Sequence, residues 1–386
     1  MDFSLTDEQR EIQALAREFA QAEIDPNAAA WDRDHRFPTE LYPKLAALGL
    51  MGVCIPEELG GAGADFLSYI LVLEELSRAD AGVGVTVAVH TSACTLPILA
   101  FGTEEQRERF VPPLARGEKI GAFALTESGS GSDAGSLRTT AVADGDGWRV
   151  SGTKQFITTG TQAGTFVFFA RTDPESEGAR GVSAFILDRE HVEVTREEEK
   201  LGLNSSSTAE LRIDTHVGGD RLLHEERKGF TVAMATLDGG RIGIAAQALG
   251  IAQAAYDVAR EYAKERKSFG KPIAEHQAIQ FKLADMSTEI DAARLLTYRA
   301  AWLKEQGEPH TEAGAKAKLF ASEMATRQTS VAIQILGGYG YTKEFPVERY
   351  YRDAKITEIY EGTSEIQRIV IARKILELQR EPAATA

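Results

Sequence analysis

Residues 279–293 read Ile-Gln-Phe-Lys-Leu-Ala-Asp-Met-Ser-Thr-Glu-Ile-Asp-Ala-Ala, and this stretch indicates how the last third of the chain folds. Its apolar side chains stand at positions 279, 283, 286, 290 and 293, alternately four and three residues apart. That spacing forms one stripe along a helix and is typical of helices packed in a bundle. Burying the four large side chains contributes roughly 6–12 kcal/mol gross, at about 1.5–3 kcal/mol each. The sequence therefore predicts a helical bundle here.

A second apolar stripe lies upstream, in the segment 242–256, where the small and apolar residues again recur at helical spacing. Between residues 121 and 225 the period changes to two, with β-branched and aromatic residues at 148–151, 166–170, 182–187 and 211–214. Gly, Asp and Ser clusters separate these short runs, a pattern typical of strands joined by turns. We expect an antiparallel β barrel or sandwich in this middle segment.

The first 120 residues again indicate helices. Thr6 with Gln9, and Thr103 with Gln106, each form the pattern of a helix-starting capping box. The fold class predicted is therefore mainly α with a β domain. Its three parts are an N-terminal helical domain (1–120), a central β domain (121–225) and a C-terminal four-helix bundle (226–386).

The composition argues against several classes of function. Lys and Arg number 43 against 58 Asp and Glu, a net charge of −15. Because so acidic a surface is repelled by phosphate and anionic lipid, we expect neither nucleic-acid binding nor membrane insertion. The longest charge-free stretch, 81–103, contains His90 and Pro97 and is interpreted as a buried helix with a break. The two cysteines and an acidic N-terminus without a secretory signal predict a cytoplasmic protein.

Familiar chemical motifs are mostly missing. Residues 129–134, Gly-Ser-Gly-Ser-Asp-Ala, match the dinucleotide fingerprint, but the residues that follow are extended in pattern rather than helical. The sequence has no phosphate-binding loop, no H-E-x-x-H and no G-x-S-x-G, and its seven histidines lack metal-ligand spacing. We therefore predict no metal site.

Three polar, Gly-rich segments are candidates for chemistry: 123–133, 334–341 and 359–368. On pattern alone, the first is either a solvated turn or a loop that cradles an anion or a polar ring edge. The second is either a helix C-cap or a close approach of backbone to a ligand. In the third, Ser364 with Gln367 forms a capping-box pattern, and Glu361 precedes the expected helix. That glutamate is either a carboxylate at the positive end of the helix dipole or a general base.

Four motifs together resemble the acyl-CoA dehydrogenase family. They are Leu125-Thr-Glu-Ser-Gly-Ser-Gly-Ser-Asp133, Glu265-Arg-Lys-Ser-Phe-Gly270, Gln334-Ile-Leu-Gly-Gly-Tyr-Gly340 and Ile359-Tyr-Glu-Gly-Thr-Ser-Glu-Ile-Gln-Arg368. They occur in that family's order, and the resemblance runs from Phe3 to about Leu376. The stretch 237–245, Leu-Asp-Gly-Gly-Arg-Ile-Gly-Ile-Ala, is most similar to the short-chain (butyryl-CoA) branch.

The resemblance implies the same three-domain fold, assembled as a homotetramer, with FAD as cofactor. It implies that Glu361 is the catalytic base. The residues it implies for lining the flavin are Phe123, Leu125, Thr126, Ser132, Phe156 and Thr158, and Thr363 and Glu365 match further residues near the FAD. Those it implies for the FAD of a neighbouring subunit are Arg266, Phe269, Gln277 and the run 334–338, which includes Gln334, Gly337 and Gly338. The implied substrate contacts are Ser132, Asp238, Arg241 and Gly362.

The reaction implied is α,β-dehydrogenation of an acyl-CoA to the trans-2-enoyl-CoA. The base takes the α-proton, FAD takes the β-hydride, and electron transfer flavoprotein receives the electrons. Burial is expected to raise the pKa of Glu361 toward working pH. Some branches of the family carry the base at the position of Gly240, where this chain has no carboxylate.

Two alternatives stay open at this point. One is an acyl-CoA oxidase that uses oxygen as the acceptor. Oxidases of this kind generally carry an additional C-terminal helical domain, and this alternative is disfavoured because the sequence ends soon after Gln379. The other is a catalytically silent member of the family with a binding role, which is disfavoured because the base and the flavin loops are present.

Overall fold

The computed structural model describes residues 3–378, so the outermost ends of the first and third predicted domains lie outside it. The first part is helical: α1 (Asp7–Phe19), α2 (Asp25–Asp34), α3 (Tyr42–Ala47), α4 (Phe66–Ala79), α5 (Ala81–Ala88), α6 (Leu96–Phe101) and α7 (Glu104–Ala115). Both predicted capping boxes are present, because the Thr6 and Thr103 hydroxyls accept from the backbone N–H groups of Gln9 and Gln106, and each glutamine side chain accepts from the threonine N–H in return.

The middle part is a sheet. Its strands are β1 (Gly121–Ala124), β2 (Thr140–Asp144), β3 (Gly147–Thr158), β4 (Thr165–Arg171), β5 (Val182–Asp188), β6 (Glu193–Glu197), β7 (Thr208–Gly218) and β8 (Leu222–Leu223). The strands follow the order β6-β7-β3-β2-β4-β5-β8, with β1 beside β4. Most neighbours are antiparallel, as expected, but β1 pairs with β4 in parallel and β2 meets β4 in parallel at one residue pair. The β domain is thus confirmed, with a mixed rather than wholly antiparallel sheet.

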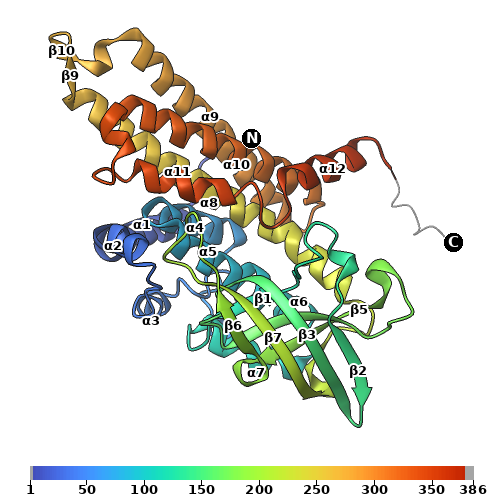
Figure 1. Ribbon diagram of the computed structural model, residues 1–386. Coiled ribbons are helices and arrows are strands. Elements are labelled where there is room, and N and C mark those ends of the chain that lie inside the picture. Colours follow the sequence, from blue (N-terminus) through green and yellow to red (C-terminus); the bar gives the residue numbers. More distant parts are fainter. Residues whose placement is uncertain (1–2, 379–386) are drawn as a thin grey trace.

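The last part is again helical, with a small hairpin at its far end. It comprises α8 (Gly229–Glu265), β9 (Lys267–Ser268), β10 (Lys271–Pro272), α9 (Gln277–Glu305), α10 (Thr311–Leu336), α11 (Val347–Ile356) and α12 (Ser364–Ile375). The long helices α8, α9 and α10 run side by side, and the β9–β10 hairpin and the large sheet lie at opposite ends of the molecule (Figure 1). The mainly α fold with a β domain is therefore confirmed.

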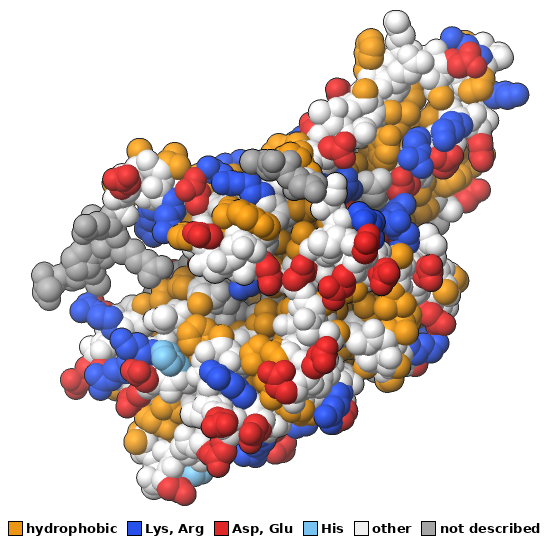
Figure 2. All heavy atoms as spheres, turned by 180° about the vertical axis from the view of Figure 1, so that it is seen from behind, with side chains coloured by type: hydrophobic (Ala, Val, Ile, Leu, Met, Phe, Trp, Pro, Cys, Tyr) orange, Lys and Arg blue, Asp and Glu red, His pale blue; other side chains and the backbone are white. Residues whose placement is uncertain are grey.

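The surface of the bundle arm carries apolar side chains among its charges (Figure 2). Four large side chains on and next to α9 are exposed: Phe269, Phe281, Leu295 and Trp302. Phe281, Leu295 and Trp302 are separated by multiples of seven residues and therefore share one face of α9, and an exposed apolar face is typical of a surface that another protein covers.

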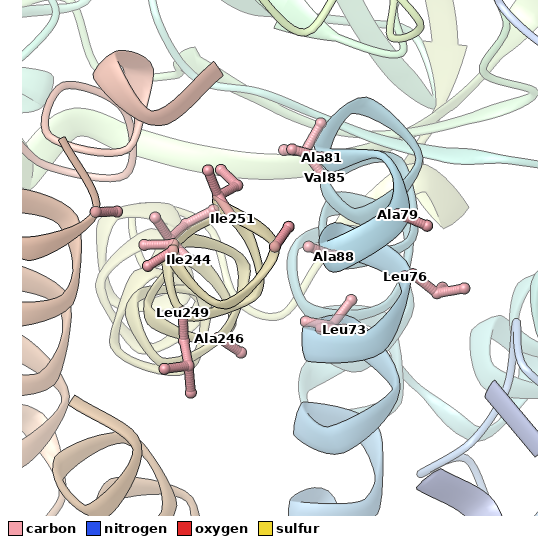
Figure 3. Close-up of a cluster of buried hydrophobic side chains, with 14 of the residues drawn as sticks. Leu73, Leu76, Ala79, Ala81, Val85, Ala88, Ile244, Ala246, Leu249 and Ile251 are labelled. Carbon is pink, nitrogen blue, oxygen red and sulfur yellow. The ribbon is translucent and has the colours of Figure 1, made fainter. Parts of the chain in front are cut away.

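The first and third parts share one hydrophobic core. Side chains of α4 and α5, among them Leu73 and Val85, lie beside α8 with Ile244 and Leu249 (Figure 3). The helices approach closely because α8 has Gly250 at the crossing, where a Cβ would lie 2.4 Å from the carbonyl oxygen of residue 74. The N-terminal helices thereby hold α8 in place beneath the site described next.

One helical stretch of the described residues, Ala81–Phe101, is long and apolar enough to cross a membrane, but 83% of its most apolar window is buried inside the protein. It is the core segment predicted for 81–103.

Candidate active site

Glu361 lies in the loop between α11 and α12, in a backbone conformation that few residues with a side chain adopt. Its φ is +52° and that of Gly362 is +92°, so two consecutive residues are left-handed. Such a conformation costs about 1–3 kcal/mol for a residue other than glycine and persists only where surrounding contacts impose it. The loop therefore holds the glutamate in a fixed direction.

The Glu361 carboxyl group points into the protein. Its Oε2 atom is buried and has no hydrogen-bond partner among the described residues. Burial raises the pKa of this carboxyl to about 7, and the charges of Lys318 and Arg241 oppose that rise. The direction of this pKa shift agrees with the expectation from the sequence. Side chains of the protein are enough to cause it, without a bound flavin or acyl chain. An acid poised near neutral pH is suited to accept and return a proton.

The carboxylate lies against Gly240 of α8. A Cβ built on Gly240 would come 1.8 Å from Oε2 of Glu361, so the glycine leaves the space that the carboxylate fills. The two positions at which the resemblance would allow a base, Glu361 and Gly240, thus face each other in this chain.

The buried Arg241 and the half-buried Asp238, both predicted to contact substrate, form an ion pair on α8. The Arg241 guanidinium donates through Nη1 to Oδ1 of Asp238, and Thr311 donates to Oδ2 of Asp238 at 2.7 Å. Nε of Arg241 is buried without a partner among the described residues. Burial lowers the pKa of Arg241, while the charges of Asp238 and Glu361 raise it.

Asp238 also lines a cleft of about 640 Å³. The wall of the cleft comes from α4, the π-helical segment Val89–Thr95, α6, α8 and the end of α9, and includes Phe66, Ser92, Leu96, Thr236 and Lys304. It is mostly apolar with a few polar groups, as ligand-binding clefts are.

The start of α12 differs from the prediction. Its N-cap is Thr363, whose hydroxyl accepts from the N–H of Ile366 at 3.3 Å, so the capping box predicted at Ser364 is wrong. The Gln367 side chain instead donates to the carbonyl oxygens of Gly362 at 2.8 Å and of Glu361 at 3.3 Å. The amide thus closes the loop that carries the glutamate. Glu365 is exposed in the first turn of α12.

A second group of predicted residues gathers on the sheet, where the ends of β1 and β3 meet. The N–H of Gln155 donates to the carbonyl of Thr126 at 2.9 Å, which joins the loop after β1 to the end of β3. Phe123 packs edge-on against Phe169. Leu125 is buried in the core, Thr158 is half-buried and Ser132 is exposed.

Lys154 and Glu127 tie these two segments together. The fully buried Lys154 Nζ donates to Oε1 of Glu127 at 2.8 Å and to the carbonyl of Leu125 at 3.1 Å. The Glu127 carboxylate also accepts from the N–H groups of Arg138 and Thr139. Burial lowers the pKa of Lys154 to about 8, against the opposing effect of Glu127.

These segments fit a large, flat cofactor such as FAD. Phe156 is 57% exposed with φ +58°, at a register shift between β3 and β7, so an aromatic face is held outward by a strained backbone. In the loop that follows Thr126, a Cβ added at Gly129 or Gly131 would have no atom within 4 Å, so both glycines leave open space above the loop. An aromatic face and open backbone in one place suit the stacking and close approach of a ring system.

The remaining predicted residues lie elsewhere. Arg266, Gly337 and Gly338 line a separate cleft of about 540 Å³ at the hairpin end of the bundle, where the Arg266 guanidinium lies 5.8 Å from the centre of the Tyr339 ring. Phe269, in the turn of the β9–β10 hairpin, is 96% exposed. Gln277 at the start of α9 and Gln334 near the end of α10 are also exposed. Figure 1 places this end far from the sheet, so within one chain the structure does not join this group to the other two.

One cluster of described residues has donor atoms close enough for a metal ion: Asp188, Glu190 and His191. The Asp188 carboxylate already pairs with Lys119 at 2.9 Å and Arg221 at 2.7 Å, so its charge is compensated without an ion.

Lys318 at the Glu361 loop was not predicted from the sequence. Its signal is a lysine on the small-residue face of a helix, with Gly314, Ala315, Ala321 and Ser322 three or four positions away. A long cation at a position that packing reserves for small side chains is a reason to look for a buried partner.

Comparison with known proteins shows what the chain resembles. Three family models match it: "Acyl-CoA dehydrogenase, N-terminal domain" at residues 6–118, "middle domain" at 122–216 and "C-terminal domain" at 227–376. A short-chain specific acyl-CoA dehydrogenase of Clostridium acetobutylicum is 50% identical, covering 97% of this chain and all of that protein. The structure of butyryl-CoA dehydrogenase from Megasphaera elsdenii has a TM-score of 0.96 at 47% identity, covering 97% of this chain and all of the other. A chain in a structure of the electron transferring flavoprotein of Acidaminococcus fermentans gives 0.96 at 50% identity, with the same coverage.

Proposed function

Because the chain belongs to the acyl-CoA dehydrogenase family, we propose that it oxidises a short-chain acyl-CoA to the trans-2-enoyl-CoA with Glu361 as the base. The observation that carries the proposal is the Glu361 carboxyl, whose Oε2 atom is buried without a hydrogen-bond partner among the described residues and whose pKa burial raises to about 7. Such a group is free to take an α-proton from a substrate beside it.

The residues around the base support this reaction. The cleft that Asp238 lines offers apolar walls for an acyl chain and its pantetheine arm. Arg241, fixed by Asp238, keeps a positive charge near Glu361 without neutralising its carboxylate through a direct bond. The unfavourable backbone of Glu361 and Gly362 keeps the carboxylate aimed, since proton removal from a weakly acidic carbon requires close alignment.

The segments around Thr126, Ser132, Phe156 and Thr158 are the residues proposed to hold FAD on the sheet. FAD, when bound, supplies the acceptor for the hydride that leaves the β-carbon. Burial of Lys154 with Glu127 beneath these segments makes them a rigid support.

A homotetramer is proposed for the assembly. Arg266, Phe269, Gly337 and Gly338 form an open group far from the sheet, so they are available to the FAD of a neighbouring subunit. Electron transfer flavoprotein is the proposed electron acceptor, supported by the likeness to a chain in a structure of an electron transferring flavoprotein. A cytoplasmic location stays a prediction.

The test is flavin reduction in the purified protein. With butyryl-CoA under anaerobic conditions the wild type should bleach the flavin, and Glu361→Gln should keep fold and flavin yet bleach at least roughly 10⁴-fold more slowly. Asp238 cannot substitute, because Arg241 and Thr311 occupy its oxygens. Wild-type-like bleaching by Glu361→Gln would refute the assignment of the base.

Two further comparisons use the same protein. A dehydrogenase should turn over with an artificial electron acceptor and not with oxygen alone, whereas an oxidase should turn over with oxygen. The absence of turnover with any acyl-CoA would indicate a catalytically silent member of the family. A series of straight-chain acyl-CoAs should give the highest kcat/KM at short length; a maximum with a long-chain or branched substrate would refute the short-chain assignment.

A further inference from the structure

Lys318 of α10 has an unusual environment for a lysine. Its side chain is fully buried, and it forms no ion pair with a carboxylate among residues 3–378 within 4.0 Å. Its Nζ donates to the carbonyl oxygen of Gly362 at 2.6 Å, directly after Glu361. A buried charge without a paired carboxylate is costly, so a nearby charge or dipole must stabilise it.

The charges near Glu361 fall into two groups. On α8 the Arg241 guanidinium is bonded to Asp238, so these two charges largely compensate each other. On α10 the Lys318 ammonium has Glu361 as its largest electrostatic partner, followed by a repulsion from Arg241. Lys318 is therefore the stronger of the two cations that favour the ionised form of Glu361.

Other titratable groups face the same space. Tyr69 of α4 and Tyr360 of the loop both feel the charge of Glu361, but burial raises the pKa of each hydroxyl, so both stay neutral. Glu358 and Glu365 act on Lys318 more weakly than Glu361 does. Burial lowers the pKa of Lys318 to about 8, and the charge of Glu361 opposes that fall, so the charged form of each group favours the charged form of the other.

We propose that Lys318 is a positioning residue for the reaction: its ammonium fixes the Gly362 carbonyl, and thereby the left-handed Glu361, and its charge keeps the buried carboxylate ionised. The inference rests on the proposed function, since it concerns the same base. Gln367 donates to the same Gly362 carbonyl without a charge, so the chain contains a matched control.

The experiment compares three variants of the flavin-loaded protein. Lys318→Met removes hydrogen bond and charge, Lys318→Arg keeps the charge, and Gln367→Met removes a neutral donor to the same carbonyl. The rate of flavin bleaching by butyryl-CoA is measured by rapid mixing from pH 5.5 to 9.5. In parallel, the infrared C=O band of protonated Glu361, identified by its loss in Glu361→Gln, is titrated without substrate.

Each of the two experiments gives a midpoint: the pH at which the bleaching rate is half-maximal, and the pH at which half of the Glu361 C=O band is lost. Lys318→Met should move both midpoints upward by about one to three pH units, because an opposite charge nearby lowers the pKa of a carboxyl by that much. Lys318→Arg should keep both midpoints close to the wild type even if the rate falls. Gln367→Met should lower the rate and leave both midpoints in place.

An unchanged midpoint in Lys318→Met, or an equal shift in Gln367→Met, would overturn the inference. If circular dichroism shows that Lys318→Met is unfolded, Lys318→Gln replaces it. Glutamine keeps a hydrogen-bond donor and loses only the charge, and the same two outcomes would overturn the inference. The proposed function fails separately: normal bleaching by Glu361→Gln refutes the base itself, whereas inactive Glu361→Gln with an unshifted Lys318→Met refutes only the role of the lysine.

Discussion

The substitution Glu127→Gln tests whether the buried pair under the proposed flavin segments behaves as the structure requires. In the wild type, Lys154 Nζ is 0% exposed and bonded to Glu127 at 2.8 Å. Glutamine keeps the shape and can still accept one hydrogen bond, but it leaves the ammonium without a counter-charge. Removing one partner of a buried ion pair costs about 3–5 kcal/mol, so we expect a loss of that size in the free energy of unfolding at pH 7.

The reverse substitution should cost less. In Lys154→Met the Glu127 carboxylate keeps the N–H groups of Arg138 and Thr139, at 2.6 Å and 3.0 Å, and lies closer to solvent. We therefore expect a loss of about 1–3 kcal/mol, and the double variant should be more stable than Glu127→Gln alone.

The dependence on pH follows from the lysine. Burial already lowers the pKa of Lys154 to about 8, and without the charge of Glu127 this pKa falls further. In the unfolded chain the lysine stays charged up to about pH 10.5. Between these two pKa values the folded protein therefore binds fewer protons than the unfolded chain. Stability then rises with pH across that interval, so the deficit of Glu127→Gln should be smaller at pH 9.5 than at pH 7.

The assay is urea unfolding followed by circular dichroism at both pH values, with flavin retention after gel filtration measured alongside. Flavin retention should fall in the same order as stability, because the pair joins the two segments proposed to hold the flavin. A Glu127→Gln protein within about 1 kcal/mol of the wild type at pH 7, or a deficit relative to the wild type that is no smaller at pH 9.5 than at pH 7, would refute the reasoning.

Two further outcomes are expected. Gly240→Ala should lower kcat roughly 10-fold or more without loss of thermal stability, because its Cβ would lie 1.8 Å from Oε2 of Glu361 and must displace the carboxylate. Gly239→Ala on the same helix meets only the end of a lysine side chain at 3.4 Å and should keep wild-type kcat; equal activities of the two variants would contradict this. Arg266→Ala should release FAD more readily, since a charged hydrogen bond contributes about 1.5–3 kcal/mol; unchanged flavin content after prolonged dialysis would count against it.

The sequence by itself determined the elements and their order. The stripe from Ile279 to Ala293 is a helix in α9, the alternating segments are strands, and the capping boxes at Thr6 and Thr103 start helices. These features depend on the period of apolar residues and on contacts within four residues, which are local properties of the chain. The motif that includes Glu361 could be singled out for the same reason.

Only the tertiary structure decided what surrounds Glu361. Gly240 on α8, Lys318 on α10 and Gln367 on α12 reach this one loop, and no local pattern specifies that meeting. The capping box predicted at Ser364 failed because Gln367 closes the Glu361 loop instead of the helix start, a choice that the packing of α12 makes. The separation of Arg266 from the sheet likewise depends on the length and direction of α8. These contacts depend on how the helices pack against one another, for example where Gly250 lets α8 approach α4 closely. The period of apolar residues along one helix does not say which helix it packs against, so the sequence pattern alone could not predict them.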